Sequence, residues 1–138
     1  MQRIASCQCG GFRVAVLGDP VFSNFCHCYA CPRRTGAPFA ANAYFMKDNV
    51  RLGGPFSTWT RTADSGRHLT THFCPTCGSN VCWTMQIRPD WYGVAPGAFN
   101  DPTFPPPEVS IWEENKFART QDVPGTRHFP KGLVLVTS

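Results

Sequence analysis

The chain lacks any long apolar segment. None of its 138 residues lie in a run that approaches the roughly 20 apolar residues of a membrane-spanning helix. No apolar stretch precedes the first cysteine, Cys7, so we expect no secretory signal. Charged residues make up only 16% of the chain, and the net charge of +4 comes without a basic run. We therefore expect a cytoplasmic protein that binds neither membranes nor nucleic acid and whose mild positive charge favours a small anionic ligand.

A sustained helical pattern is missing as well. No window of about eleven residues or more keeps the apolar spacing of an amphipathic helix. Short apolar and β-branched runs, separated by turn residues, instead predict an all-β fold, mainly antiparallel, in one small domain with many loops. The proline-rich segment Asn100–Pro107 is predicted to be a loop, Ala63–Gly66 a hairpin loop, and a short helical turn is possible after Cys31. The predicted strands are Phe12–Val16, Asn42–Phe45, Ser57–Thr62, His68–Phe73, Asn80–Thr84, Tyr92–Ala95 and Val109–Trp112, with Leu133–Val136 either a last strand or a loose tail.

Cysteine, by contrast, is abundant, with eight residues in a short chain. In a protein without an export signal these thiols are expected to stay reduced, and clustered cysteines then indicate metal or redox chemistry. The alternative is a secreted protein held together by disulfides. Cys-X-Cys pairs argue against it, because such close neighbours are poorly placed to bond with each other and well placed to chelate an ion.

Two of the cysteine pairs are typical of half-sites for zinc. In Cys74-Pro75-Thr76-Cys77-Gly78 the Cys-X-X-Cys turn points two thiols at one ion, and Gly78 permits the positive φ that such a turn needs. Cys7 and Cys9 would face the same side of an extended strand, so both could reach one ion. Together the four predict a closed, structural zinc site. The alternative is a thioredoxin-like redox motif, but no βαβ pattern surrounds Cys74 and Cys77.

The remaining cluster, Cys26-His27-Cys28-Tyr29-Ala30-Cys31, offers three thiols within six residues. Three protein ligands leave one zinc position open, as in catalytic sites. Three alternatives remain. Cys82 could close the site with a fourth thiolate, although it is most simply a small buried apolar residue. His27 could ligate, although its side chain should face away from Cys26 and Cys28 in an extended segment. The cluster could also bind no metal, or bind it only loosely.

These motifs resemble the glutathione-dependent formaldehyde-activating enzyme family, whose domain is shared with centromere protein V. The likeness covers roughly residues 4 to 120, with residues 121–138 as a C-terminal extension. It implies a β-tent fold with a zinc-ribbon-like arrangement. The matching segments are Cys7-Gln8-Cys9-Gly10, Cys26-His27-Cys28-Tyr29-Ala30-Cys31, Thr35-Gly36 with Phe39, Phe73-Cys74-Pro75-Thr76-Cys77-Gly78, Gly97–Pro102 and Ile111-Trp112.

The resemblance also implies two zinc ions and a reaction. The structural ion would be held by Cys7, Cys9, Cys74 and Cys77, and the substrate-facing ion by Cys26, Cys28 and Cys31. The implied activity is that of a carbon–sulfur lyase or synthase, similar to S-(hydroxymethyl)glutathione synthase, with glutathione as the thiol partner. The chain departs from the family pattern at Pro32 and at Lys116-Phe117-Ala118, which lie outside the ligands but could reshape a pocket.

Two arginines directly follow the three-thiol cluster. A guanidinium of Arg33 or Arg34 could hold a glutathione carboxylate through paired hydrogen bonds, while the alternative is a solvated basic pair. A hypothesis of a different class also stays open, because a family resemblance does not establish a reaction. On that hypothesis both zinc ions are architectural, and the chain is a non-catalytic binding or scaffold module. The sequence leaves the oligomeric state open between monomer and homodimer.

Overall fold

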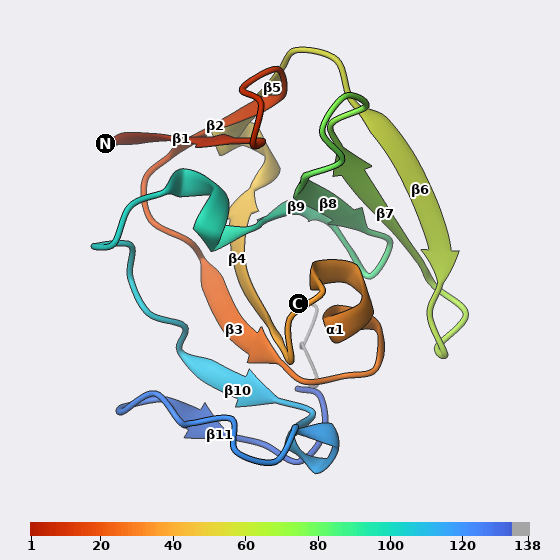
Figure 1. Cartoon of the computed structure of the whole chain (residues 1–138), viewed down its shortest axis with the longest axis vertical. Coiled ribbons are helices and arrows are strands. Elements are labelled where there is room, and N and C mark those ends of the chain that lie inside the picture. The colour runs from red at the N-terminus through yellow and green to blue at the C-terminus, as the bar shows by residue number, and fades with distance from the viewer. Residues whose placement is uncertain (134–138) are drawn as a thin grey trace.

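Two β-sheets make up the computed structural model, which describes residues 1–133 (Figure 1). The smaller sheet has the order β1-β2-β5, and the larger has the order β11-β10-β3-β4-β9-β8-β7-β6. All pairings are antiparallel except those of β10 with β3 and with β11. The predicted all-β, mainly antiparallel fold is confirmed. The strands are β1 Gln2–Ser6, β2 Arg13–Leu17, β3 Phe22–Cys26, β4 Ala40–Met46, β5 Val50–Gly53, β6 Ser57–Thr62, β7 His68–Phe73, β8 Asn80–Met85, β9 Arg88–Val94, β10 Val109–Ile111 and β11 Arg127–His128.

The main apolar core joins the two sheets. On β2, Val14 and Val16 are fully buried while Arg13 and Leu17 face solvent, which is the alternation of a strand with one covered face. These valines pack with Phe45 of β4 and further residues of β8 and β9. Burying one such side chain stabilises the fold by about 1.5–3 kcal/mol. The core therefore fixes the small sheet against the large one.

The larger sheet has a second apolar cluster on its other face. Tyr44 and Phe45 are neighbours on β4, so their side chains point to opposite faces. Phe45 belongs to the main core, whereas Tyr44 packs with Trp83 and Trp91. Tyr44 and Trp83 meet edge to face, with ring centroids 6.1 Å apart. This second cluster forms the floor on which the candidate site is built.

Helical structure is short throughout the described part of the chain. The helix α1, Ala30–Thr35, ends at Gly36, whose φ of 74° lies in the left-handed region. It confirms the helical turn expected near Cys31, and it lies beside β4 (Figure 1). Across residues 1–133, no helix has the length and apolar character needed to cross a membrane. The 3-10 turns are η1 Lys47–Asn49, η2 Pro96–Phe99 and η3 Glu113–Asn115.

Most predicted strands are present, and β6 and β7 have the predicted bounds. The hairpin loop between them is confirmed, since the Gly66 N–H donates to the Ala63 carbonyl at 2.8 Å. Strand β9 begins at Arg88, earlier than predicted, and the proline-rich loop is confirmed. Apart from its first residue, the predicted segment Leu133–Val136 lies outside the described residues. The strands that the sequence did not predict are β1, β3, β5 and β11.

Candidate metal centres

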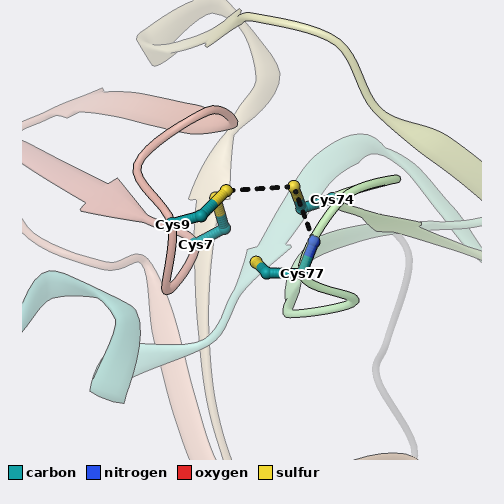
Figure 2. Close-up of side chains that lie close together, drawn as sticks. All are labelled: Cys7, Cys9, Cys74 and Cys77. Carbon is teal, nitrogen blue, oxygen red and sulfur yellow. Dashed lines mark hydrogen bonds between the residues drawn. The ribbon is translucent and has the colours of Figure 1, made fainter.

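Four cysteines from two distant turns meet at one point (Figure 2). Cys7 and Cys9 lie in the turn after β1, and Cys74 and Cys77 lie in the turn after β7. All four Sγ atoms lie within 4.8 Å of one another. The Sγ of Cys9 is 3.6 Å from that of Cys7 and 3.6 Å from that of Cys74. The structure thus brings together the four cysteines that the sequence grouped.

The first half of this group is not the strand that we predicted. Strand β1 ends at Ser6, and the chain then turns tightly. The Gly10 N–H donates to the Cys7 carbonyl at 3.1 Å, and the Cys7 N–H donates to the Phe12 carbonyl at 2.9 Å. Gly10 takes a φ of 85°, which a residue with a side chain rarely adopts. A glycine turn, not strand alternation, therefore places Cys7 and Cys9 side by side.

Backbone and hydroxyl donors surround these sulfurs. Phe12 donates its N–H to Cys7 Sγ at 3.2 Å, and this hydrogen bond lowers the pKa of Cys7 below its ordinary value. The Ser79 hydroxyl lies 3.3 Å from Cys77 Sγ, and hydrogen bonds from Ser79 lower the pKa of Cys77 to about 5. In the same turn, the Cys77 N–H approaches Cys74 Sγ at 3.5 Å. Such donors favour thiolates, which are the form that binds a metal.

The sulfur spacing fits a tetrahedral metal site. Zinc–sulfur bonds of about 2.3 Å imply sulfur–sulfur separations of about 3.8 Å around a tetrahedron. The two separations of 3.6 Å are close to that value before any ion draws the ligands into place. Four thiols with this spacing could therefore hold one metal ion with every coordination position filled by protein.

A second group joins Cys26, Cys28 and Cys31, whose Sγ atoms also lie within 4.8 Å of one another. Cys26 ends β3, Cys28 follows in the loop, and Cys31 lies in α1. The Cys31 N–H donates to Cys28 Sγ at 3.4 Å. Hydrogen bonding from Cys26 lowers the pKa of Cys28, and the same interaction raises the pKa of the buried Cys26. Cys28 is therefore the sulfur most readily present as a thiolate, and the three sulfurs together could hold a second metal ion.

Neither of the two extra ligands considered from the sequence joins this group. His27 is buried and lies 3.0 Å through Nε2 from the Ser110 hydroxyl, which donates to Glu113 at 2.6 Å. Cys82 is fully buried in the main core, where burial raises the pKa of its thiol to about 12. Both lie outside the two sulfur groups, as expected for a hydrogen-bonded histidine and a small buried apolar residue. Among the described residues, the second group therefore has three thiols and no fourth ligand from another cysteine, a histidine or a carboxylate.

A third ligand-like group was not foreseen from the sequence. Glu113, Asp122 and His128 bring two carboxylates and one imidazole within reach of one ion. The ammonium of Lys116 already pairs with Asp122 and lies 4.0 Å from Glu113. His128 Nδ1 is 2.8 Å from a Glu113 carboxylate oxygen. These contacts compensate the acidic charges without a metal and tie the segment containing β11 to the end of β10.

A cavity of about 500 Å³ adjoins the second sulfur group, because Cys31 forms part of its wall. Volumes in this range accommodate drug-sized ligands. Three guanidinium groups line it, from Arg33 and Arg34 of α1 and from Arg61 of β6, and no carboxylate does so among the described residues. The sequence identified the first two arginines but not Arg61. The remaining lining residues are Ala30, Asn42, Tyr44, Trp59, Leu69, Thr71, Phe73, Gly78, Asn80 and Trp83.

Arg34 is fixed in the cavity wall. Its guanidinium carbon lies 4.2 Å from the centroid of the Trp83 ring, which is a cation–π contact. Its Nη2 donates to Asn42 Oδ1 at 2.8 Å, and Asn42 Nδ2 in turn donates to Asn24 Oδ1 at 2.9 Å. These contacts use one edge of the guanidinium and hold its orientation. That Arg34 or Arg33 binds a substrate carboxylate stays a prediction.

The position of Trp83 depends on Gly93 of the neighbouring strand, because an added Cβ at Gly93 would overlap the indole. We expect Gly93→Ala to lower the free energy of unfolding by about 1–3 kcal/mol, as overpacking of a filled interior does. It should also disturb the Trp83–Arg34 contact. The measurement is urea unfolding followed by tryptophan fluorescence. Gly97→Ala is the control, since a Cβ there meets nothing within 4 Å, and an equal loss in both variants would contradict the packing argument.

The comparisons with known proteins agree with this geometry. A family model described as "Glutathione-dependent formaldehyde-activating enzyme" matches residues 2–115. Among solved structures, the chain is similar to the crystal structure of a Rhodobacter sphaeroides protein, at 23% identity and a TM-score of 0.54. That match covers 69% of this chain and 85% of the other, and it shows the fold. No curated protein is similar enough to count as a match.

Proposed function

The chain belongs to the glutathione-dependent formaldehyde-activating enzyme family, and on that basis we propose a zinc-dependent carbon–sulfur lyase or synthase. Its substrates are a small anionic thiol such as glutathione and an aldehyde such as formaldehyde. The observation that carries the proposal is the cavity that joins Cys31 to three arginines. A metal site that opens into a cationic cavity suits a thiol that also carries carboxylates.

The two sulfur groups divide into two kinds of zinc site. Cys7, Cys9, Cys74 and Cys77 offer four thiolates and suit a structural ion. The group of Cys26, Cys28 and Cys31 offers three, so a fourth position is available to a substrate sulfur. Zinc bound there would deprotonate that thiol and hold it as a nucleophilic thiolate. A cytoplasmic compartment is part of the proposal, because thiols stay reduced there and remain available as ligands.

The arginines compensate the charge of the second site. Three thiolates outweigh the two charges of a zinc ion, and a substrate thiolate adds one more negative charge. Such a site is costly in a partly enclosed cavity unless cations lie nearby. Arg33, Arg34 and Arg61 supply them, and their guanidinium forks can also hold the substrate carboxylates.

The reaction is an addition in which atoms and electrons balance. The thiol sulfur bonds to the carbonyl carbon, and the carbon–oxygen π pair moves to oxygen. The proton released from the thiol ends on that oxygen, so the product is a hydroxyalkyl thioether. The reverse reaction breaks the same carbon–sulfur bond. The chain's own contribution is to orient the thiol, to neutralise its charge and to keep the reacting carbon beside Cys31.

Binding of the thiol tests the proposal. We expect calorimetry on protein loaded with two zinc ions to show glutathione binding that weakens as salt rises, because attraction between exposed charges is screened. The double variant Arg33→Ala/Arg34→Ala should bind at least about tenfold more weakly, since each charged hydrogen bond contributes about 1.5–3 kcal/mol. Arg88→Ala is the matched control, because Arg88 pairs with Asp90 and packs on Trp91 outside the cavity.

The alternative class of function makes a different prediction. A non-catalytic zinc-stabilised module would hold both ions and show no heat with glutathione or related thiols at millimolar concentration. It would also leave the rate of exchange between formaldehyde and glutathione, measured by NMR, at the uncatalysed value. That pair of results, in protein shown to contain its second zinc, would favour the architectural interpretation over the enzyme.

A further inference from the structure

The cavity has two chemically different walls. Helix α1 contributes the wall with Cys31, Arg33 and Arg34. The β6–β7 hairpin contributes Trp59 and Arg61 from one face of β6, and Leu69, Thr71 and Phe73 from one face of β7. Side chains two apart on a strand share a face, so this wall is a continuous surface. Apart from Arg61 and Thr71, the hairpin wall is apolar.

This apolar wall is open to the cavity. Trp59 is 61% exposed, and Leu69 and Phe73 are only partly buried. Leu69 packs against the cluster of Tyr44, Trp83 and Trp91, which extends the apolar surface across the floor. Apolar surface of this kind gains free energy when a ligand removes it from water. The hydroxymethyl group from formaldehyde has a single carbon and a polar hydroxyl, and it is too small to cover such a wall.

We propose that the aldehyde used by this site carries an apolar chain or ring, which lies against Trp59, Leu69 and Phe73. This inference rests on the proposed function and specifies its substrate class. The adduct is then a hemithioacetal of a larger aldehyde: the thiol sulfur bonds to the aldehyde carbon, and the thiol proton ends on the aldehyde oxygen. The cationic wall holds the thiol partner, while the hairpin wall selects the group attached to the reacting carbon.

Stable thioethers separate these two contributions. S-methylglutathione and S-hexylglutathione share the same peptide part and differ by five methylenes, each worth about fourfold in affinity when fully buried. In calorimetry on zinc-loaded protein we expect S-hexylglutathione to bind at least about tenfold more tightly. Trp59→Ala and Leu69→Gln should reduce that preference below about threefold, because both changes act on the hexyl group more than on the peptide part that the two ligands share. Ile87→Gln makes the same chemical change outside the cavity and should leave the preference intact.

Two independent readouts place the apolar group. The fluorescence of Trp59 should shift to shorter wavelength when S-hexylglutathione covers it, and this shift should be absent in Trp59→Phe. NMR exchange measurements should show a larger rate enhancement over the uncatalysed reaction for hexanal than for formaldehyde, and Leu69→Gln should abolish the difference. Trp59 is exposed, so Trp59→Ala is expected to fold even if Leu69→Gln does not.

The outcomes distinguish this inference from the function it rests on. Equal affinities for the two thioethers, in a protein that binds glutathione, would overturn the apolar substrate class and leave the proposed function standing. A preference that survives both Trp59→Ala and Leu69→Gln would place the apolar group elsewhere and would also overturn it. If zinc-loaded protein binds neither glutathione nor S-methylglutathione, the proposed function fails, and the inference fails with it.

Discussion

Cys77→Ser is expected to yield protein that is unfolded or aggregated at neutral pH. Cys77 is one of four sulfurs that join the turn after β1 to the turn after β7, and these turns belong to different sheets. A structural zinc site contributes an apparent 10–16 kcal/mol in small zinc domains, against a net stability of about 5–15 kcal/mol for a typical domain. If the loss of one ligand abolishes zinc binding, the protein loses a stabilising free energy as large as its net free energy of unfolding.

Circular dichroism, thermal melting and zinc analysis of the purified variant provide the measurement. Cys82→Ala is the control, because Cys82 is buried in the core but lies outside both sulfur groups. It should lose some stability by leaving a small cavity and should retain both zinc equivalents. A soluble Cys77→Ser protein with unchanged melting would defeat the assignment of a structural site.

The fold could be predicted where a local pattern carried the information. The β6–β7 hairpin combines a strand of alternating residues, Ser57–Thr62, with a return strand, and the polar loop between them contains Gly66, whose φ is 84°. Strand β3 was missed because it buries polar residues that alternation does not reveal. Its Ser23 hydroxyl accepts the Glu108 N–H at 3.1 Å, and its Asn24 accepts from Asn42 across the sheet. Strand β11 has only two polar residues and is defined by its pairing with β10.

The candidate sites, too, could be predicted only where residues close in sequence carry the information. Spacing within a few residues was enough to group Cys26, Cys28 and Cys31, whose sulfurs the structure brings together. Residue type was enough to predict that Cys7 and Cys9 share a site with Cys74 and Cys77. A glycine turn, and not a strand as predicted, brings Cys7 and Cys9 together. The cavity could not be predicted, because it depends on sheet order. Arg61 lies on β6, at one edge of the eight-stranded sheet, yet it lines the same cavity as α1, which lies beside β4 in the interior of that sheet.

Removing one ligand from the second site should affect metal content and activity but not the fold, in contrast to Cys77→Ser. Cys28→Ala is expected to lose one of two zinc equivalents and all thiol-dependent activity while keeping its fold. Cys28 is only partly buried and lies in a loop between β3 and α1, so few packing contacts depend on it. The four-cysteine group is untouched by this change and continues to join the two sheets. Melting should therefore fall by only a few degrees, as expected for a loss of about 1 kcal/mol in a domain of this size.

The Cys28→Ala experiment compares metal content, melting and glutathione binding in the same preparation. Tyr29→Ala is the matched control, because Tyr29 is the next residue, is 78% exposed and lies outside the sulfur groups. It should retain both zinc equivalents. Loss of both ions from Cys28→Ala would mean that the two sites are not independent, and retention of both would remove Cys28 from the ligands. If Cys28→Ala loses one ion but still binds glutathione as tightly as before, glutathione does not bind at the second metal. That result would contradict the proposal, because the proposal requires the substrate sulfur to occupy the position that three cysteines leave free.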